Sequence, residues 1–379
     1  MPEHFERRLL ELLSQMTAKL RNALRFSWMY FLYGSGALWW VKRQLARRGG
    51  IIVLTFHRVL PENEQARSYS PHGMVVREKT FECLARYAAG RYENLQPGDT
   101  KPNSPTNGRP KLLFTFDDGW LDNACTAFPI AQKYNIPLTI FICSAHIGKR
   151  LPFWPERFMA LWRAAELNET TSWELFNLLA EARGARTAVS ANGTAHVDWA
   201  LDTLKQVPTE EREHLLKKIE KVIALTARPP EKKDCPDVTM SWNDIAELAQ
   251  GGVTFGSHSQ SHEILPLIPP QEVKREVSES KRAIAEQLKK ECRFFSYPNG
   301  DSSESVRDLV AQAGYELAFL NQPGVWTRDT DPFSIPRINV WEGKLVGPSG
   351  TFSRAVFEYT VFWKAYRAGK PSLSNRATQ

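Results

Sequence analysis

The chain has 379 residues, of which 42% are hydrophobic and 24% are charged. This composition is ordinary for a soluble globular protein with one large domain or two, and it argues against a disordered or fibrous chain. The formal net charge is +7, and residues 1–50 hold nine Lys or Arg against three acidic residues. The five cysteines are far apart in the sequence and form no paired motif, which favours reduced thiols over a disulfide framework.

Residues 1–48 are predicted to form a basic and aromatic helical segment. Its run Phe26–Val41 carries no charge, contains six aromatic residues besides Phe26, and is flanked by Arg and Lys. The run is shorter than the roughly twenty residues of a spanning helix, and it has no small-residue cleavage site, so we expect no cleavable signal peptide. Peripheral contact with anionic phospholipid and packing on the rest of the protein explain the run equally well. A cytoplasmic, membrane-associated or cell-envelope location is compatible with this, and we expect no nucleic-acid partner.

Short apolar runs alternate with helical patterns over most of the remaining chain. Predicted buried strands lie at Ile51–Arg58, Lys111–Phe116, Leu138–Cys143 and Val253–Ser257. This alternation predicts an α/β fold with a parallel sheet. Residues 153–230 carry only long helical patterns and are predicted to be a helical insertion. We therefore expect one domain at 49–345 that contains this insertion, and a C-terminal extension at 346–379.

Two adjacent carboxylates, Asp117 and Asp118, follow the predicted strand at 111–116 and precede Gly119. In α/β folds, catalytic residues collect at the carboxyl ends of the strands. Taken alone, an Asp-Asp-Gly sequence is more often a simple turn. The functional interpretation therefore depends on metal ligands elsewhere in the chain.

His258 and His262 follow another predicted strand and are four residues apart, a spacing that predicts two imidazoles on one face of a helical turn. Two histidines and one of the two aspartates would form a ligand set for a zinc-like ion. Such a set leaves open coordination positions, as catalytic metal sites do. The other aspartate would then be free to act as a general base.

Three sequence motifs together resemble those of the polysaccharide deacetylase family, the NodB-homology carbohydrate esterases. They are Thr115–Gly119, His258–His262 and Phe295–Gly300, and the resemblance extends over roughly residues 50–340. It implies a distorted (β/α) barrel and a divalent metal, usually zinc. The implied activity is removal of N-acetyl groups from amino sugars of a polysaccharide, an oligosaccharide or a lipid-linked glycan.

The resemblance also implies roles for individual residues. Asp117 matches the general base, and Asp118, His258 and His262 match the metal ligands. In the third motif, Tyr297-Pro298-Asn299, the backbone amide of Asn299 would stabilise the oxyanion.

The sequence departs from the family pattern in two places. Ser296 stands where many relatives have an arginine that contacts the catalytic aspartate, and Arg337 is a candidate replacement. No histidine follows His262, although relatives carry a late histidine that protonates the departing amine. Some relatives are permuted and place this histidine on an N-terminal strand, which makes His57 the candidate general acid and His146 a weaker competitor.

Two other functions remain open from the sequence. One is a metal-dependent amidohydrolase that acts on a non-sugar acyl-amide. The other is a catalytically silent glycan-binding protein, which the two departures favour and the intact aspartate and histidine pairs oppose.

Overall fold

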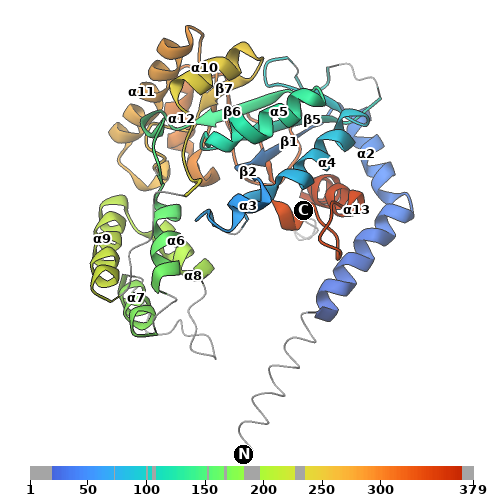
Figure 1. The fold of residues 1–379 in the computed structure, drawn as a ribbon. Helices are drawn as coiled ribbons and strands as arrows, with labels where there is room; N and C mark the ends of the chain where they lie inside the picture. The colour runs from blue at the N-terminus through green and yellow to red at the C-terminus, as the bar shows by residue number, and fades with distance from the viewer. Residues whose placement is uncertain are drawn as a thin grey trace, which may run out of the picture.

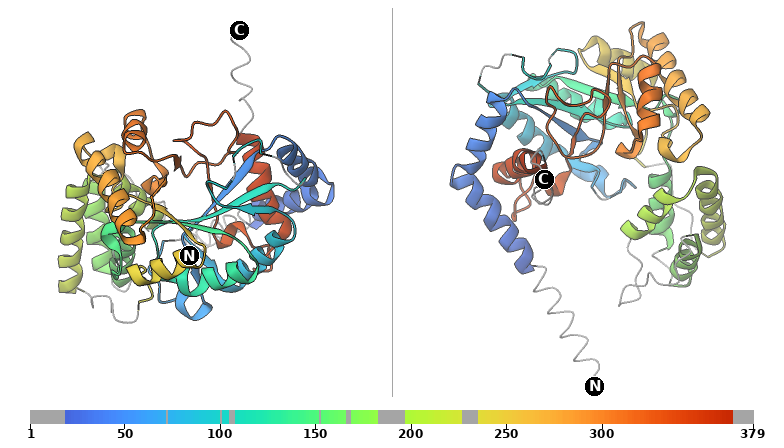
Figure 2. Two further views of the ribbon diagram at one scale, coloured as in Figure 1. Left: turned by 90° about the horizontal axis from the view of Figure 1, so that it is seen from above. Right: turned by 180° about the vertical axis from the view of Figure 1, so that it is seen from behind.

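The computed structural model describes residues 19–71, 73–99, 101–104, 108–151, 153–165, 169–182, 197–226 and 235–368. A curled β-sheet with helices on its outer side forms the centre of the molecule (Figure 1). Four helices of a helical insertion lie on one side of this centre, and an N-terminal helical segment lies on the opposite side (Figures 1 and 2).

The main sheet is parallel throughout, with the order β10-β1-β5-β6-β7-β8-β9 and β4 paired with the first half of β5. Its strands are β1 (Ile51–Phe56), β4 (Glu93–Leu95), β5 (Lys111–Phe116), β6 (Leu138–Ile142), β7 (Thr254–Ser257), β8 (Phe294–Ser296), β9 (Leu317–Phe319) and β10 (Ile338–Asn339). Every residue of β1, β5 and β6 is buried, which explains why these runs are continuously apolar instead of alternating.

A single segment joins the two edges of the sheet. Ile335 forms a bridge to Phe319 at the end of β9, and three residues later β10 pairs with β1. The sheet is therefore curled into a partly closed barrel, and the α/β architecture agrees with the sequence prediction. A separate parallel pair, β2 (Arg58–Leu60) and β3 (Val75–Arg77), lies beside β1 in the chain.

Helices surround the strands in the view from above (Figure 2). They are α3 (Glu62–Gln65), α4 (Glu78–Ala89), α5 (Phe128–Lys133) after a π-helical turn at Asn123–Ala127, α10 (Trp242–Gln250), α11 (Pro270–Leu288) and α12 (Glu304–Gln312). Short 3₁₀ turns lie at Ser144–His146, Leu265–Leu267, Pro298–Gly300 and Glu342–Lys344. At the start of α10, Ser241 and Asp244 form a reciprocal capping box, which fixes where this helix begins.

The insertion consists of α6 (Trp154–Ala165), α7 (Glu169–Ala182), α8 (Val197–Gln206) and α9 (Thr209–Thr226). These helices enclose an apolar cluster of their own that includes Phe158, Leu204 and Leu216. Arg150 and Val238 form a β-bridge, so the chain leaves the sheet domain and returns to it at the same place. The insertion is thereby held next to the carboxyl ends of the strands.

Residues 19–34 are helical and are followed by α2 (Ala37–Arg47). Both helices lie near the C-terminal elements α13 (Arg354–Glu358), a π-helical segment at Tyr359–Trp363, and α14 (Lys364–Ala368). The buried carboxylate of Glu358 accepts hydrogen bonds from Tyr87 (2.6 Å) and Tyr92 (3.0 Å) and pairs with Lys42 of α2. Among the described residues, no helix is long and apolar enough to cross a bilayer.

Candidate active site

The turn after β5 places two carboxylates side by side at the carboxyl end of the sheet. Asp118 and Gly119 both have left-handed backbone conformations, with φ of 75° and 76°. A Cβ atom at position 119 would lie 2.8 Å from Cγ2 of Ile142, so this tight turn requires glycine. Asp117 and Asp118 are each only 3% exposed.

Asp118, His258 and His262 form a compact cluster of potential metal ligands. Oδ1 of Asp118 lies 3.5 Å from Nε2 of each histidine, and the three ligand atoms lie within 4.8 Å of one another. Oδ1 is buried without a hydrogen-bond partner, while Oδ2 accepts a hydrogen bond from the indole of Trp120 (3.0 Å). An unpartnered buried carboxylate oxygen that faces two imidazoles fits a divalent metal ion.

The ring orientation of His258 also suits metal binding. Its Nδ1 lies 2.8 Å from the backbone carbonyl oxygen of Ser296. Because a carbonyl oxygen accepts only, Nδ1 carries the proton, and the lone pair of Nε2 is directed into the cluster. This second contact of a histidine ligand is the usual way in which proteins fix the tautomer that binds metal.

The predicted helical turn at His258–His262 is wrong. Ser259 and His262 have φ of 66° and 64°, and the segment is a loop. Glu276 of α11 accepts hydrogen bonds from the backbone N–H groups of Gln260 (2.9 Å) and Ser261 (2.8 Å). This buried carboxylate satisfies two backbone donors of the loop, and the loop brings the two imidazole centroids to 5.0 Å.

Asp117 points into the same region but is held by a cation. The guanidinium of Arg337, which is fully buried, donates to Oδ1 of Asp117 at 2.8 Å and to Oδ2 at 2.6 Å. It also donates to Ser296 Oγ (2.8 Å). Burial would raise the pKa of Asp117, but Arg337 and then His258 outweigh burial and hold this pKa below its ordinary value. The small side chain of Ser296 therefore lies beside Arg337, the residue directly before β10.

His57 and His146 occupy different environments. His57 follows β1 and lines the pocket together with Asp117 and Asn299. Burial lowers the pKa of His57, and the charges of Asp118 and Asp117 oppose this shift. His146 contacts the carbonyl oxygen of Ser261 (3.1 Å) through Nε2 and supports the histidine loop instead.

Only two residues of the third motif, Phe295–Gly300, line the pocket. Asn299 has φ of 57° and lines the pocket together with Gly300. Tyr297 is fully buried and donates a hydrogen bond from its hydroxyl to the carbonyl oxygen of Phe333 (3.0 Å). Tyr297 and Pro298 are therefore buried in the protein and do not line the pocket.

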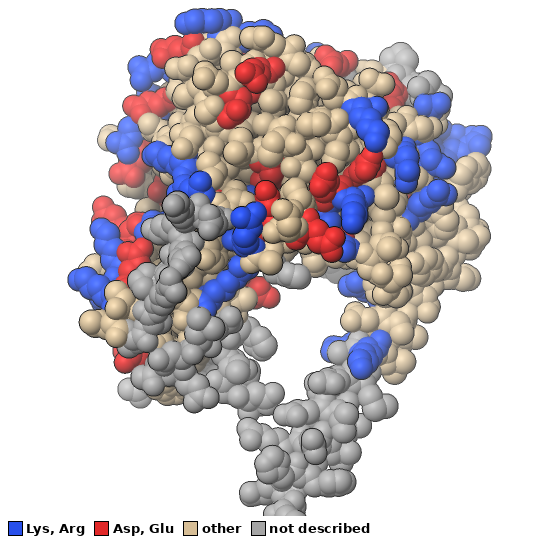
Figure 3. Space-filling model, viewed as in Figure 1, with Lys and Arg blue, Asp and Glu red and all other residues tan. Residues whose placement is uncertain are grey.

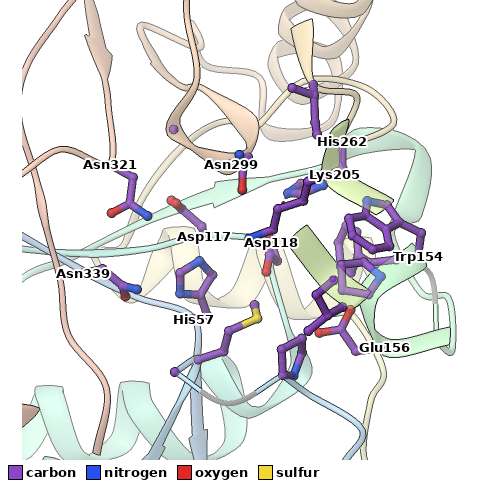
Figure 4. Close-up of a pocket in the computed structure, with 18 of the residues that line it drawn as sticks. His57, Asp117, Asp118, Trp154, Glu156, Lys205, His262, Asn299, Asn321 and Asn339 are labelled. Atoms are coloured by element: carbon purple, nitrogen blue, oxygen red, sulfur yellow. Dashed lines mark ion pairs between the residues drawn. The ribbon is translucent and has the colours of Figure 1, made fainter. Parts of the chain in front are cut away.

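The pocket has a volume of about 550 Å³ and lies between the sheet domain and the insertion. Figure 4 shows His57, Asp117 and Asp118 on one side and Trp154 and Glu156 of α6 on the other. Glu156 is 1% exposed, and its Oε1 has no hydrogen-bond partner. Burial, together with the charges of Asp237 and Asp118, raises the pKa of Glu156 well above its ordinary value. The insertion thus adds an aromatic ring and a carboxyl group to the site, and sequence reasoning had not placed the carboxyl group there.

A buried ion-pair network beneath the site also escaped sequence reasoning. Arg58, which is fully buried, pairs with Asp122 (2.6 Å) and Asp237 (2.6 Å). Its guanidinium carbon lies 4.2 Å from the ring centroid of Trp120, the same indole that donates to Asp118. The network therefore positions Asp118, a potential metal ligand, through Trp120. The only signal in the sequence is an arginine at the end of the predicted buried strand Ile51–Arg58.

The parallel α/β sheet carries at its strand ends an Asp-His-His cluster beside a second, ion-paired aspartate, and this arrangement is consistent with a metal-dependent hydrolase. The match to known proteins names the family. The polysaccharide deacetylase family model matches residues 104–318, more than half of the chain, and the protein belongs to this family of hydrolases. The putative polysaccharide deacetylase YxkH of Bacillus subtilis (strain 168) is 20% identical over 308 residues, which cover 80% of this chain and 75% of that protein.

Solved structures of deacetylases resemble this chain at low sequence identity. The Streptococcus pyogenes deacetylase PplD, in complex with acetate, is 15% identical with a TM-score of 0.49, covering 78% of this chain and 94% of that chain. IcaB from Ammonifex degensii is 17% identical with a TM-score of 0.47, covering 84% and 98%.

Proposed function

We propose that the protein removes N-acetyl groups from amino sugars of a polysaccharide, an oligosaccharide or a lipid-linked glycan. One observation carries this proposal. Asp117, a carboxylate outside the ligand cluster, is held by Arg337 next to Asp118, His258 and His262. A candidate base and a candidate metal-binding set at one end of one pocket are a combination that can hydrolyse an unactivated amide.

Asp118, His258 and His262 would hold the divalent ion, for which zinc fits the ligand set best. When bound, such an ion supplies Lewis-acid activation of water and of the acyl oxygen. Asp117 takes the proton of the attacking water. Arg337 keeps the Asp117 carboxylate ionised and fixes its orientation through two hydrogen bonds.

The remaining steps fall to two other residues that line the same pocket. The backbone amide of Asn299 donates a hydrogen bond to the oxygen on which negative charge develops, a contact worth about 3 kcal/mol in related sites. His57 gives a proton to the amine nitrogen as the carbon–nitrogen bond breaks, which releases acetate and a free amino sugar. His57 suits this role better than His146, because His57 lines the pocket with Asp117 whereas Nε2 of His146 is engaged with the loop carbonyl of Ser261.

The shape and lining of the pocket support a sugar as the substrate. Its volume of about 550 Å³ suits a ligand of a few rings. Trp154 offers an aromatic face, and Glu156, Asp198 and Asp202 offer carboxyl groups that can bond to hydroxyls. A small non-sugar acyl-amide that lacks hydroxyls would make few hydrogen bonds to these carboxyl groups.

The experiment is an acetate assay on the purified full chain. The substrates are an N-acetylglucosamine oligomer and, in parallel, a non-sugar N-acetyl amide such as acetylated lysine peptide. Acetate should appear from the oligomer, cease with chelator, and return when zinc is added. Release from the peptide alone would replace the proposal with a non-sugar amidohydrolase. If the protein binds zinc and the oligomer but releases no acetate from it, the protein is a silent glycan binder.

A further inference from the structure

Large exposed apolar side chains concentrate on one part of the described chain, residues 19–48, here called the N-terminal arm. Eleven large hydrophobic residues are exposed in the described chain, and eight of them belong to the arm. They are Leu20, Leu24, Trp28, Tyr30, Phe31, Tyr33, Trp39 and Trp40. Such a concentration marks an interaction surface, since isolated exposed apolar residues are normal and clusters are not.

The first helix of the arm has two distinct faces. Leu20, Leu24, Trp28 and Phe31 follow the i, i+4, i+8, i+11 spacing that places side chains on one face of a helix. Leu20, Leu24 and Phe31 are each 61% exposed and Trp28 is 49% exposed. Met29, on the other face, is 4% exposed. Within residues 19–34 only Met29 and Leu32 are buried, so this helix packs on the protein near its C-terminal end and leaves the apolar stripe exposed.

The second helix, α2, repeats this arrangement. Leu38 and Val41 are fully buried, while Trp39 is 58% exposed. The guanidinium carbon of Arg43 lies 5.2 Å from the ring centroid of Trp39. Aromatic rings alternating with basic groups are the composition of segments that lie at a membrane–water interface.

The charge of the arm has a single sign. Residues 19–48 contain seven Lys or Arg and no Asp or Glu. In Figure 3 the coloured part of the arm shows blue and tan atoms only. A surface that is both apolar and basic is complementary to an anionic lipid surface, whereas two copies of the arm would bring like charges together.

We propose that the N-terminal arm docks the enzyme on the surface of an anionic phospholipid bilayer. The stripe Leu20-Leu24-Trp28-Phe31 enters the interfacial zone, and the basic residues of the arm other than Lys42 contact lipid headgroups. The arm holds its position on the body through its buried face, the Lys42–Glu358 ion pair and the contact between Tyr30 and Ser353 (3.2 Å). Docking therefore also fixes the orientation of the body on the membrane. This proposal does not depend on the substrate.

The test is co-sedimentation of the full chain with vesicles of phosphatidylcholine alone or with added phosphatidylglycerol. The arm variant is Leu24→Ser/Trp28→Ser/Phe31→Ser. The matched control is Trp173→Ser/Leu225→Ser, because these two residues are 57% and 87% exposed on the insertion. The parent and the control should bind vesicles that contain phosphatidylglycerol, and salt should weaken binding. The arm variant should bind about tenfold or more weakly.

Equal binding by the parent and the arm variant, or no binding by the parent, would overturn the proposal. A parent dimer that the arm variant converts to a monomer, without vesicle binding by either, would assign the stripe to a second copy of the chain. Unchanged thermal unfolding and unchanged acetate release from a soluble oligomer establish that the arm variant is folded. If neither the parent nor the arm variant releases acetate from any glycan, this result would count against the proposed activity and not against docking.

Discussion

Replacing Arg337 by methionine tests whether the ion pair with Asp117 is as strong as its geometry indicates. Arg337 is fully buried and makes two hydrogen bonds to the carboxylate, at 2.8 and 2.6 Å. The variant leaves Asp117 buried with only Ser296 Oγ nearby as a weak donor, at 3.4 Å. Removing one partner of a buried pair costs about 3–5 kcal/mol. We therefore expect the free energy of unfolding to fall by about this amount at pH 7.

A double-variant cycle separates the charge effect from lost packing. In the parent, Asp117→Asn should destabilise, because Arg337 is then left without its carboxylate. In the Arg337→Met background the same Asp117→Asn change should stabilise, because it removes an unpaired buried charge. The assay is urea unfolding of all four proteins with chelator present, so that metal binding does not contribute to the measured free energy.

The pH dependence of stability should also reverse. In the parent the pKa of Asp117 lies below its ordinary value, so its contribution is present above the ordinary pKa and is lost as the solution is acidified below that value. In Arg337→Met, burial is no longer outweighed and the pKa rises. Acidification from pH 7 towards 5 should then stabilise the variant relative to the parent. A destabilisation below about 1 kcal/mol, or the same sign of the Asp117→Asn effect in both backgrounds, would refute this reasoning.

Three further predictions concern other parts of the molecule. Trp120→Phe removes the indole donor to Asp118 and should weaken zinc binding about 10–100-fold in chelator competition. His57→Gln should lower kcat for acetate release about a hundredfold, whereas His146→Gln should cost less than tenfold. Burial, then a neighbouring lysine, lowers the pKa of Lys344 to about 8 from 10.5. Burial of the charged Lys344 destabilises the folded state fully below pH 8, and this destabilisation decreases as the pH rises to 10.5. Lys344→Met should therefore raise Tm at pH 7 and leave it nearly unchanged at pH 10.5.

Each of these has its own control. Trp326→Phe changes another buried tryptophan that lies away from the cluster, and it should lower stability without affecting zinc affinity; equal loss of affinity in both variants would contradict the role of Trp120. A larger fall of kcat in His146→Gln than in His57→Gln would reverse the assignment of the proton donor. If Tm of Lys344→Met falls at pH 7, then the hydrogen bond from Lys344 to the carbonyl oxygen of Asn339 (2.8 Å) outweighs the burial penalty.

The sequence predicted well those features that depend on local patterns. Buried parallel strands have continuous apolar runs, and the residues that follow them meet at one edge of the sheet. Asp118, His258 and His262 could therefore be expected together although about 140 residues separate them. The helical turn between the histidines was wrong, because the donors of that loop are satisfied by Glu276 from another helix.

Features that depend on distant parts of the chain could not be predicted in the same way. Arg337 was a candidate partner of Asp117 only through the family resemblance, and its guanidinium reaches Asp117 because residues 335–339 join both edges of the curled sheet. Arg58 meets its two carboxylates at separations of 64 and 179 residues. Glu156 reaches the pocket because the insertion folds back over the strand ends. No spacing rule relates such positions, so their contacts required the three-dimensional structure.

The most direct test of the account compares Asp117→Asn with Asp118→Asn for both zinc content and acetate release from an N-acetylglucosamine oligomer. The two carboxylates are adjacent and equally buried, so each variant is a matched control for the other. The account predicts that Asp117→Asn keeps stoichiometric zinc and loses about a hundredfold or more in kcat, while Asp118→Asn loses zinc. Normal turnover by Asp117→Asn, or loss of its zinc, would contradict the separation of base and ligand.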